Sequence, residues 1–162
     1  MFLVIFIGTK DINIIFNAIL EGIHRGIGFD RAILAFCDPG KTKFTGNYGM
    51  GPKAQDVAER LSLKIGSGDD VFIRGYANNQ PVFVEDVHEE KVRSLLSDNF
   101  LSLIDTNAFV VSPIHAHGNI IGLFYADKAL SKHTITQEEY QAFQHFAIQA
   151  NIALERISVS GK

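Results

Sequence analysis

Apolar residues near the start of the chain recur every three or four positions, which is the spacing of an amphipathic α-helix. We expect this helix to begin at Thr9 or Asp11, either of which can cap it, and to end near Arg25. Gly26 and Gly28 favour its end, because glycine readily adopts the left-handed conformation found there. Its apolar face is formed by Ile12, Ile15, Phe16, Ile19, Leu20 and Ile23.

Short apolar runs bounded by glycine and proline predict β-strands in the middle of the chain. The expected strands span residues 31–37, 43–48, 63–65 and 82–84. Asp38-Pro39-Gly40-Lys41 predicts a turn, so the first two strands form a hairpin. Pro52 suits the first turn of a helix that ends near Leu61. A short helix is expected over 71–77, and residues 88–105 favour an amphipathic helix or irregular structure.

The last third of the chain predicts a hairpin and a long helix. Strands at 108–116 and 120–126 are joined around Gly118-Asn119. Thr136, with Glu139 three residues later, predicts a capping box at the start of the helix. One apolar stripe of this helix contains Tyr140, Phe143, Ala147, Ala150 and Leu154, and a second contains Phe146, Ala153 and Ile157.

These elements predict an α+β fold, an α/β sandwich with an antiparallel sheet of five or six strands. The first and last helices are expected on one face of the sheet. Because one sheet face buries about one apolar stripe, the second stripe predicts a homodimer through the terminal helices. The alternative is that Met1–Ile7 folds back over this surface within one monomer.

Length and composition are those of one soluble domain. The chain has 162 residues, of which 46% are hydrophobic and 20% charged. We expect an apolar extension or linker at 1–9, a domain at 10–157 and a tail at 158–162. The apolar run at the start is too short to span a bilayer and is a poor signal peptide. It fits a helix extension, a strand, part of a longer polypeptide or an expression artefact.

Charge and cysteine content exclude several classes of function. The net charge of −3 argues against nucleic-acid binding, which needs a basic surface. The single cysteine, Cys37, excludes an internal disulfide and a multi-cysteine zinc site, and it favours a cytoplasmic location. No phosphate-binding loop and no nucleophile–base pair is written in the sequence, and we expect no cofactor, metal or catalytic residue.

Four motifs resemble, in order and spacing, the GAF domain, a small-molecule sensing module. They are Gly-Ile-Gly-Phe-Asp-Arg at 26–31, the segment 66–86 with its proline, valine and aspartate, the hairpin 113–127, and the final helix. The resemblance covers about residues 10 to 157. The first and third motifs look most similar to GAF modules attached to HDOD output domains in bacterial signalling proteins.

The resemblance implies a ligand pocket between the sheet and the inserts that join its strands. On this basis we expect a noncatalytic sensory domain that binds a small molecule; in different members of the family this pocket holds cyclic nucleotides, tetrapyrroles or other small ligands. The chain would belong to a bacterial signal transduction protein. The expected ligand residues are Phe72, Arg74, Tyr76, Tyr48 and Asp86, with Arg74 placed to pair with an anion. Alternatives are a dimerisation module with a vestigial pocket and, less favoured, a small enzyme of the same fold.

Three further features have an ordinary structural interpretation. Cys37 lies in an apolar strand, and we expect a buried, inert thiol rather than a redox group. His115 and His117 alternate on a strand and are expected to be surface or edge residues rather than metal ligands. Asp127-Lys128 followed by Glu138-Glu139 partly resembles a cyclic-nucleotide signature of the family, but the acidic pair is better explained as complementing a helix N-terminus.

Overall fold

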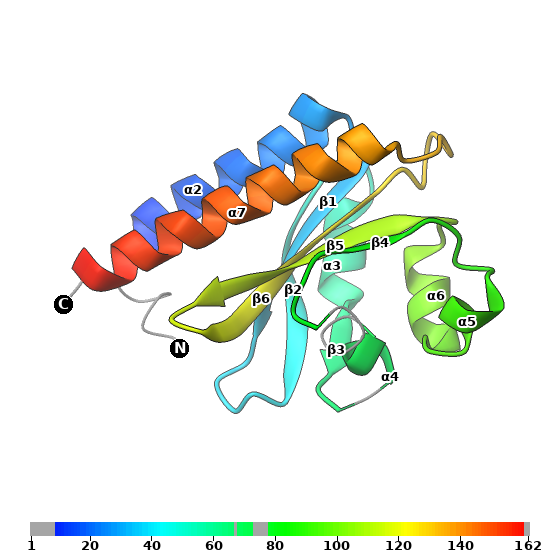
Figure 1. The fold of residues 1–162 in the computed structure, drawn as a ribbon, viewed down its shortest axis with the longest axis horizontal. Helices are drawn as coiled ribbons and strands as arrows, with labels where there is room; N and C mark the ends of the chain where they lie inside the picture. The colour runs from blue at the N-terminus through cyan, green and yellow to red at the C-terminus, as the bar shows by residue number, and fades with distance from the viewer. Residues whose placement is uncertain (1–8, 67, 73–77, 161–162) are drawn as a thin grey trace.

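A six-stranded antiparallel sheet forms the centre of the computed structural model, which describes residues 9–66, 68–72 and 78–160 (Figure 1). The strand order is β3-β2-β1-β6-β5-β4, so β1 and β6 lie in the middle. The bounds are β1 Arg31–Cys37, β2 Lys43–Met50, β3 Ser62–Lys64, β4 Val82–Val84, β5 Phe109–Ala116 and β6 Asn119–Asp127. The predicted antiparallel α+β fold is therefore confirmed.

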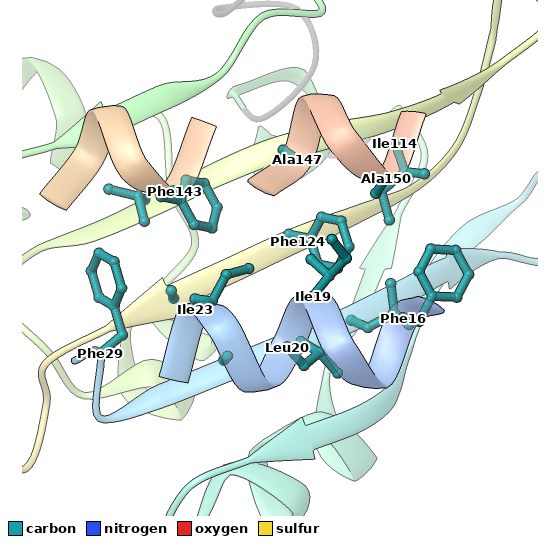
Figure 2. Close-up of a cluster of buried hydrophobic side chains, with 14 of the residues drawn as sticks. Phe16, Ile19, Leu20, Ile23, Phe29, Ile114, Phe124, Phe143, Ala147 and Ala150 are labelled. Carbon is teal, nitrogen blue, oxygen red and sulfur yellow. The ribbon is translucent and has the colours of Figure 1, made fainter. Parts of the chain in front are cut away.

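The first and last helices lie side by side on one face of this sheet, as expected (Figure 1). Helix α2 spans Thr9–Glu21 and continues into a π-helix, η1, at Gly22–Ile27, which Gly28 ends with a φ of 107°. Helix α7 spans Gln137–Ser160. Figure 2 shows their apolar side chains pointing toward each other and toward the sheet. We call this packed set the helix-face core.

Helices α3 (Ala54–Arg60) and α6 (Asp98–Ile104) cover the opposite face. The side chains buried between them and the sheet form a second apolar cluster, the insert-face core. Two short helices, α4 (Gly68–Asp70) and α5 (Glu90–Arg93), complete the described inserts. The largely buried strands β1, β5 and β6 therefore lie between two layers, one of helices and one of inserts.

Strand β2 and helix α3 approach each other closely because two glycines face the helix. A Cβ atom on Gly46 would collide with the backbone of Ala58, and one on Gly49 with the backbone of Ala54. Only glycine removes this clash without moving the helix. The pattern in residues 43–50 therefore encodes the packing of α3 as well as the strand.

The structure corrects several predicted boundaries. Residues 88–105 contain the two short helices α5 and α6 rather than one element. The β5–β6 turn is centred on His117 and Gly118, with φ of 52° and 80°, rather than on Gly118 and Asn119. The expected helix over 71–77 lies mostly outside the described residues, and α4 begins before it. The extension expected at residues 1–9 also lies outside them except for its last residue.

Candidate functional site

The insert face of the sheet is packed with the protein's own aromatic side chains. Phe72, Phe100 and Phe109 are at most 4% exposed. Phe100 meets Phe109 edge-on at 5.9 Å between ring centroids, and Phe109 stacks on Tyr125 at 5.5 Å. In the described part of the chain, these side chains pack against one another and the sheet, and a second cavity of about 430 Å³ lies at the edge of the inserts, lined by Ser62, Asp69 and Phe100 among others.

Two of the predicted ligand residues lie on opposite faces of the sheet. Phe72 belongs to the insert-face core. Tyr48 pairs with Leu34 of β1, and Leu34 belongs to the helix-face core. Paired residues of antiparallel strands point to the same face, so Tyr48 points away from Phe72. The structure does not bring these two side chains together.

A β-bulge explains the orientation of Tyr48. The pairing shifts between Leu34 and Ala35, so that Gly46 opposes Ala35 while Tyr48 opposes Leu34, and Asn47 is left as the extra residue. With unbroken alternation Tyr48 would share the face of Phe44, which lies in the insert-face core. The extra residue transfers it to the other face.

The remaining predicted ligand residues are also dispersed. Asp86 follows β4, is exposed, and accepts a hydrogen bond of 2.9 Å from the backbone N–H of His88. Strands β1, β6 and β5 separate β4 from the strand that carries Tyr48. Arg74 and Tyr76 lie outside the described residues. That these five residues bind a ligand therefore stays a prediction.

A cleft of about 580 Å³ lies beside β4, and we call it the edge cleft. One wall is the end of α6 and the residues that follow it, and the other is the loop of residues 128–135 between β6 and α7. Its lining includes Phe83, Glu85, Val87, Arg93, Asp98, Asp105, Lys128, Lys132, His133 and Ile135. Glu85 and Val87, on either side of the predicted Asp86, belong to this lining, whereas Asp86 itself does not.

A buried ion pair joins the two central strands at this end of the sheet. Arg31 is 5% exposed and Asp127 is fully buried. The Arg31 Nε lies 3.0 Å from Asp127 Oδ1, and Nη2 lies 2.6 Å from Oδ2, so the contact is bidentate. The Tyr125 hydroxyl donates to the same Oδ2 at 2.5 Å.

The charges of this network are strongly coupled. Burial alone would lower the pKa of Arg31, but the hydrogen bonds and the charge of Asp127 outweigh it and raise that pKa. Burial, and then the Asp127 charge, raise the pKa of Tyr125 well above its ordinary value. The hydroxyl therefore stays protonated and available as a hydrogen-bond donor.

The same ion pair ties together the two walls of the edge cleft. Arg31 Nη2 donates to the carbonyl oxygen of Ile104 at the end of α6. Asp127 Oδ1 accepts a hydrogen bond of 3.0 Å from the backbone N–H of Ala129, in the opposite wall. The relative position of the walls is thus fixed through Arg31 and Asp127.

Lys128 and Glu139 hold the start of α7 against the same loop. Their charged groups are 2.5 Å apart, with side chains 11% and 20% exposed. The capping box is confirmed: the Thr136 N–H donates to Glu139 at 2.8 Å, and the Glu139 N–H donates to Thr136 Oγ1 at 3.1 Å. Burial alone would raise the pKa of Glu139, but the hydrogen bonds from Lys128 and Thr136 outweigh it and lower that pKa.

The surroundings of Cys37 and His117 are those of residues at a strand end and in a turn. Cys37 is half-buried rather than buried, because it ends β1 at the margin of the insert-face core. His117 lies in the turn, and its Nδ1 is 3.4 Å from Glu155 of α7. Among the described residues, no three His, Cys, Asp or Glu side chains are grouped to hold a metal ion.

The outer surface of the α2–α7 layer exposes apolar side chains. Ile148 and Ile152 of α7 are 52% and 42% exposed, and Ile14 of α2 is 58% exposed. The sequence predicted this surface at other positions: Phe146 and Ala153 of the second stripe are half-buried, and Phe146 packs against Gly22 of η1. The side chain of Ile157, the third member of that stripe, lies outside the described residues.

Solved structures share this fold over nearly the whole chain. A methyl-accepting chemotaxis protein fragment has a TM-score of 0.73 at 21% identity, covering 93% of this chain and 92% of its own. The blue-light absorbing form of the Thermosynechococcus elongatus PixJ GAF-domain has a TM-score of 0.73 at 18% identity, covering 94% and 89%. A GAF domain/HD domain protein from Geobacter sulfurreducens has a TM-score of 0.72 at 12% identity, covering 94% and 97%.

The family follows from the sequence as well as from the fold. The model of the GAF domain family matches residues 11–154, so this chain belongs to the GAF domain family. None of the curated proteins compared with the chain matches it. Over its described residues, the structure holds no helix with both the length and the apolar character needed to cross a membrane.

Proposed function

We propose that this GAF domain is a noncatalytic, small-molecule-binding sensory domain of a bacterial signal transduction protein, acting as a cytoplasmic homodimer. The observation that carries the proposal is the position of the edge cleft, one wall of which is the loop that leads into α7. A ligand there contacts the segment that positions α7, and α7 presents the exposed apolar surface. Ligand occupancy and helix packing are therefore joined through residues 128–139.

The likeness to signalling proteins supports this proposal. Similar structures come from a chemotaxis protein, a light-absorbing PixJ GAF domain and a protein that combines GAF and HD domains. In the last of these a GAF domain occurs with a second domain in one protein. We propose a comparable arrangement here, with an output domain in a longer chain, as the resemblance to HDOD-linked GAF modules also suggests.

The proposed dimer forms through the outer faces of α2 and α7. Ile148 and Ile152 are four residues apart and lie on one side of α7. Among the exposed residues near them, Asn17, Ala18 and Gln149 are uncharged, and Arg156 lies one turn beyond Ile152. A second copy would bury these isoleucines in a bundle of four helices, which apolar packing favours. Membrane or nucleic-acid partners are not part of this proposal.

The proposal retains the predicted ligand residues, but each would contact a ligand only under a stated condition. Phe72, Arg74 and Tyr76 would take part if a ligand entered between the sheet and the inserts, and Asp86 borders the edge cleft. Tyr48 would contact such a ligand only if its orientation changed. The ligand therefore has two possible binding places, between the sheet and the inserts or in the edge cleft. Substitutions in each place distinguish them.

A second candidate function is a dimerisation module with a vestigial pocket. The packing of Phe72, Phe100 and Phe109 against the sheet favours it, because these side chains occupy the pocket that the family resemblance implies. A small enzyme, the third alternative, would require turnover that depends on Cys37.

Native mass spectrometry and light scattering test the proposal. We expect a dimer mass with a small molecule retained, and a monomer near 17.9 kDa for Ile148→Glu. Val71→Glu is the matched control, since Val71 is 51% exposed but lies in the insert between β3 and β4. A wild-type monomer refutes the dimer, and a dimer that neither retains nor binds any small molecule favours the vestigial module.

A further inference from the structure

We propose that the edge cleft binds a small amphipathic zwitterion, an amino acid or a short peptide with free termini. This inference rests on the proposed sensory function and specifies its ligand. The cleft volume of about 580 Å³ is that of a site for a small organic ligand, which typically measures about 300–1,000 Å³.

The lining of the cleft contains unpaired charges of both signs. Arg93 and Lys132 are the cations, and Glu85, Asp98 and Asp105 are the acids. Within the described part of the chain, none of these five side chains makes an ion pair or a hydrogen bond. Lys128 differs, because its ammonium already donates to Glu139.

Charges of both signs around one cavity select for a ligand that carries both. A purely anionic ligand would meet three carboxylates, and a purely cationic ligand would meet an arginine and a lysine. A molecule with an ammonium and a carboxylate satisfies each sign with its opposite. Phe83, Val87 and Ile135 supply apolar contact for a side chain between the charged groups.

The loop that carries Lys132 is shaped by its own hydrogen bonds. The Lys132 N–H donates to the carbonyl oxygen of Lys128 at 2.8 Å, and Lys132 has a φ of 58°. Ser131 donates to Asp30 through its N–H at 2.7 Å and through its hydroxyl at 2.9 Å. The backbone of this wall is therefore formed before any ligand arrives, which lowers the entropy cost of binding.

Asp105 and Lys132 stand on walls that meet at the buried ion pair. Asp105 follows Ile104, whose carbonyl oxygen accepts from Arg31, and Lys132 lies three residues beyond Ala129, whose N–H donates to Asp127. A zwitterion bound to both side chains spans the walls. Its effect reaches α7 through the loop, because the loop ends at the Thr136 cap.

Thermal-shift and calorimetric titrations of the full chain test this inference. The probes are the twenty common L-amino acids and a set of di- and tripeptides, which separate the two possible sources of the zwitterion. For each probe that binds, the matching amine and the matching carboxylic acid are titrated as well. We expect the zwitterion to bind more tightly than either half.

Variants locate the site. Lys132→Ala and Asp105→Asn should each weaken binding about tenfold or more, the value of one charge-assisted hydrogen bond. Asparagine keeps the left-handed backbone that Asp105 adopts, with a φ of 44°. Lys43→Ala is the control, since Lys43 is exposed on β2 and lies outside the cleft lining.

The outcomes separate this inference from the proposed function. The inference is overturned if no amino acid or peptide binds, or if both cleft variants bind as wild type does. If native mass spectrometry finds a ligand of another class, the sensory function stands and the edge-cleft assignment fails.

Discussion

Glu155 on α7 accepts a hydrogen bond of 2.5 Å from the backbone N–H of His117, at the tip of the β5–β6 hairpin. One turn earlier on the same helix, the side-chain oxygen of Asn151 accepts from the backbone N–H of His115 at 2.9 Å. A register shift between Ile114 and His115 accompanies these contacts. The hairpin tip is therefore bound to the helix through backbone donors, and the Nδ1 of His117, 3.4 Å from Glu155, adds a side-chain contact.

Replacing Glu155 should loosen the hairpin tip without unfolding the domain. We expect Glu155→Ala to cost about 1 kcal/mol or less, because the carboxylate is half-exposed. Amide hydrogen exchange at His117 should become faster. Gln149→Ala, at an exposed position of α7, is the control, and equal exchange rates in both variants would contradict the contact.

The Arg31–Asp127 pair should be the most sensitive polar contact described here. Arg31→Met leaves a buried carboxylate without its cation, so we expect a loss of about 3–5 kcal/mol in urea unfolding. Arg60→Met is the matched control, because its ion pair with Asp56 is more than 60% exposed on both sides and should contribute about 0.5 kcal/mol or less. Similar losses for the two variants would show that Arg31 is not held in the buried pair.

Glu139 should make stability depend on pH. Its pKa is lowered in the folded protein from an ordinary value of 4.5, so its ionised form stabilises the fold fully above 4.5. This contribution is lost as the pH falls through the lowered folded-state value. We expect Glu139→Gln to be about 1 kcal/mol less stable at pH 7, with the difference from wild type shrinking below pH 4.5. Chemical unfolding at a series of pH values measures this.

Glu138→Gln is the control for that series. Glu138 lies in the same first turn of α7 but is exposed and does not contact Lys128. It should show little pH-dependent difference from wild type. If the difference in unfolding free energy between wild type and Glu139→Gln instead grew in acid, it would contradict a carboxylate that stabilises the fold in its charged form.

Gly46 should not tolerate a methyl group. We expect Gly46→Ala to destabilise the protein by about 3 kcal/mol, because the added Cβ meets the rigid backbone of α3 at Ala58. Gly26→Ala should lie within about 1 kcal/mol of wild type, or above it, since the added Cβ meets nothing within 4 Å. Thermal unfolding of the two variants decides whether β2 and α3 are packed this closely.

Local patterns in the sequence predicted the features that depend on neighbouring residues. The capping box needs only Thr136 and Glu139, three positions apart, and it forms as expected. The stripe from Tyr140 to Leu154 likewise predicted the buried face of α7, because helical periodicity fixes which residues share a side.

Features that depend on distant pairing were not predictable in this way. Arg31 and Asp127 are 96 positions apart, and no local spacing indicates that they meet. The orientation of Tyr48 was missed because one extra residue, Asn47, changes the alternation of β2, and the sequence of a strand gives little sign of a bulge. The edge cleft combines residues from α5, α6 and the loop before α7, so it emerges only from the tertiary structure.

Polar contacts thus hold helix α7 at two points, at Glu139 near its first turn, which pairs with Lys128, and at Glu155, which binds the hairpin tip. At 1.5 Å per residue these contacts are about 24 Å apart along the helix axis. Tilting the helix about one of these contacts would stretch the other beyond hydrogen-bond distance. Sliding the helix along its axis would break both contacts. Rotation about its own axis within the length of the side chains, or complete release of one contact, are the movements that this geometry leaves to the helix.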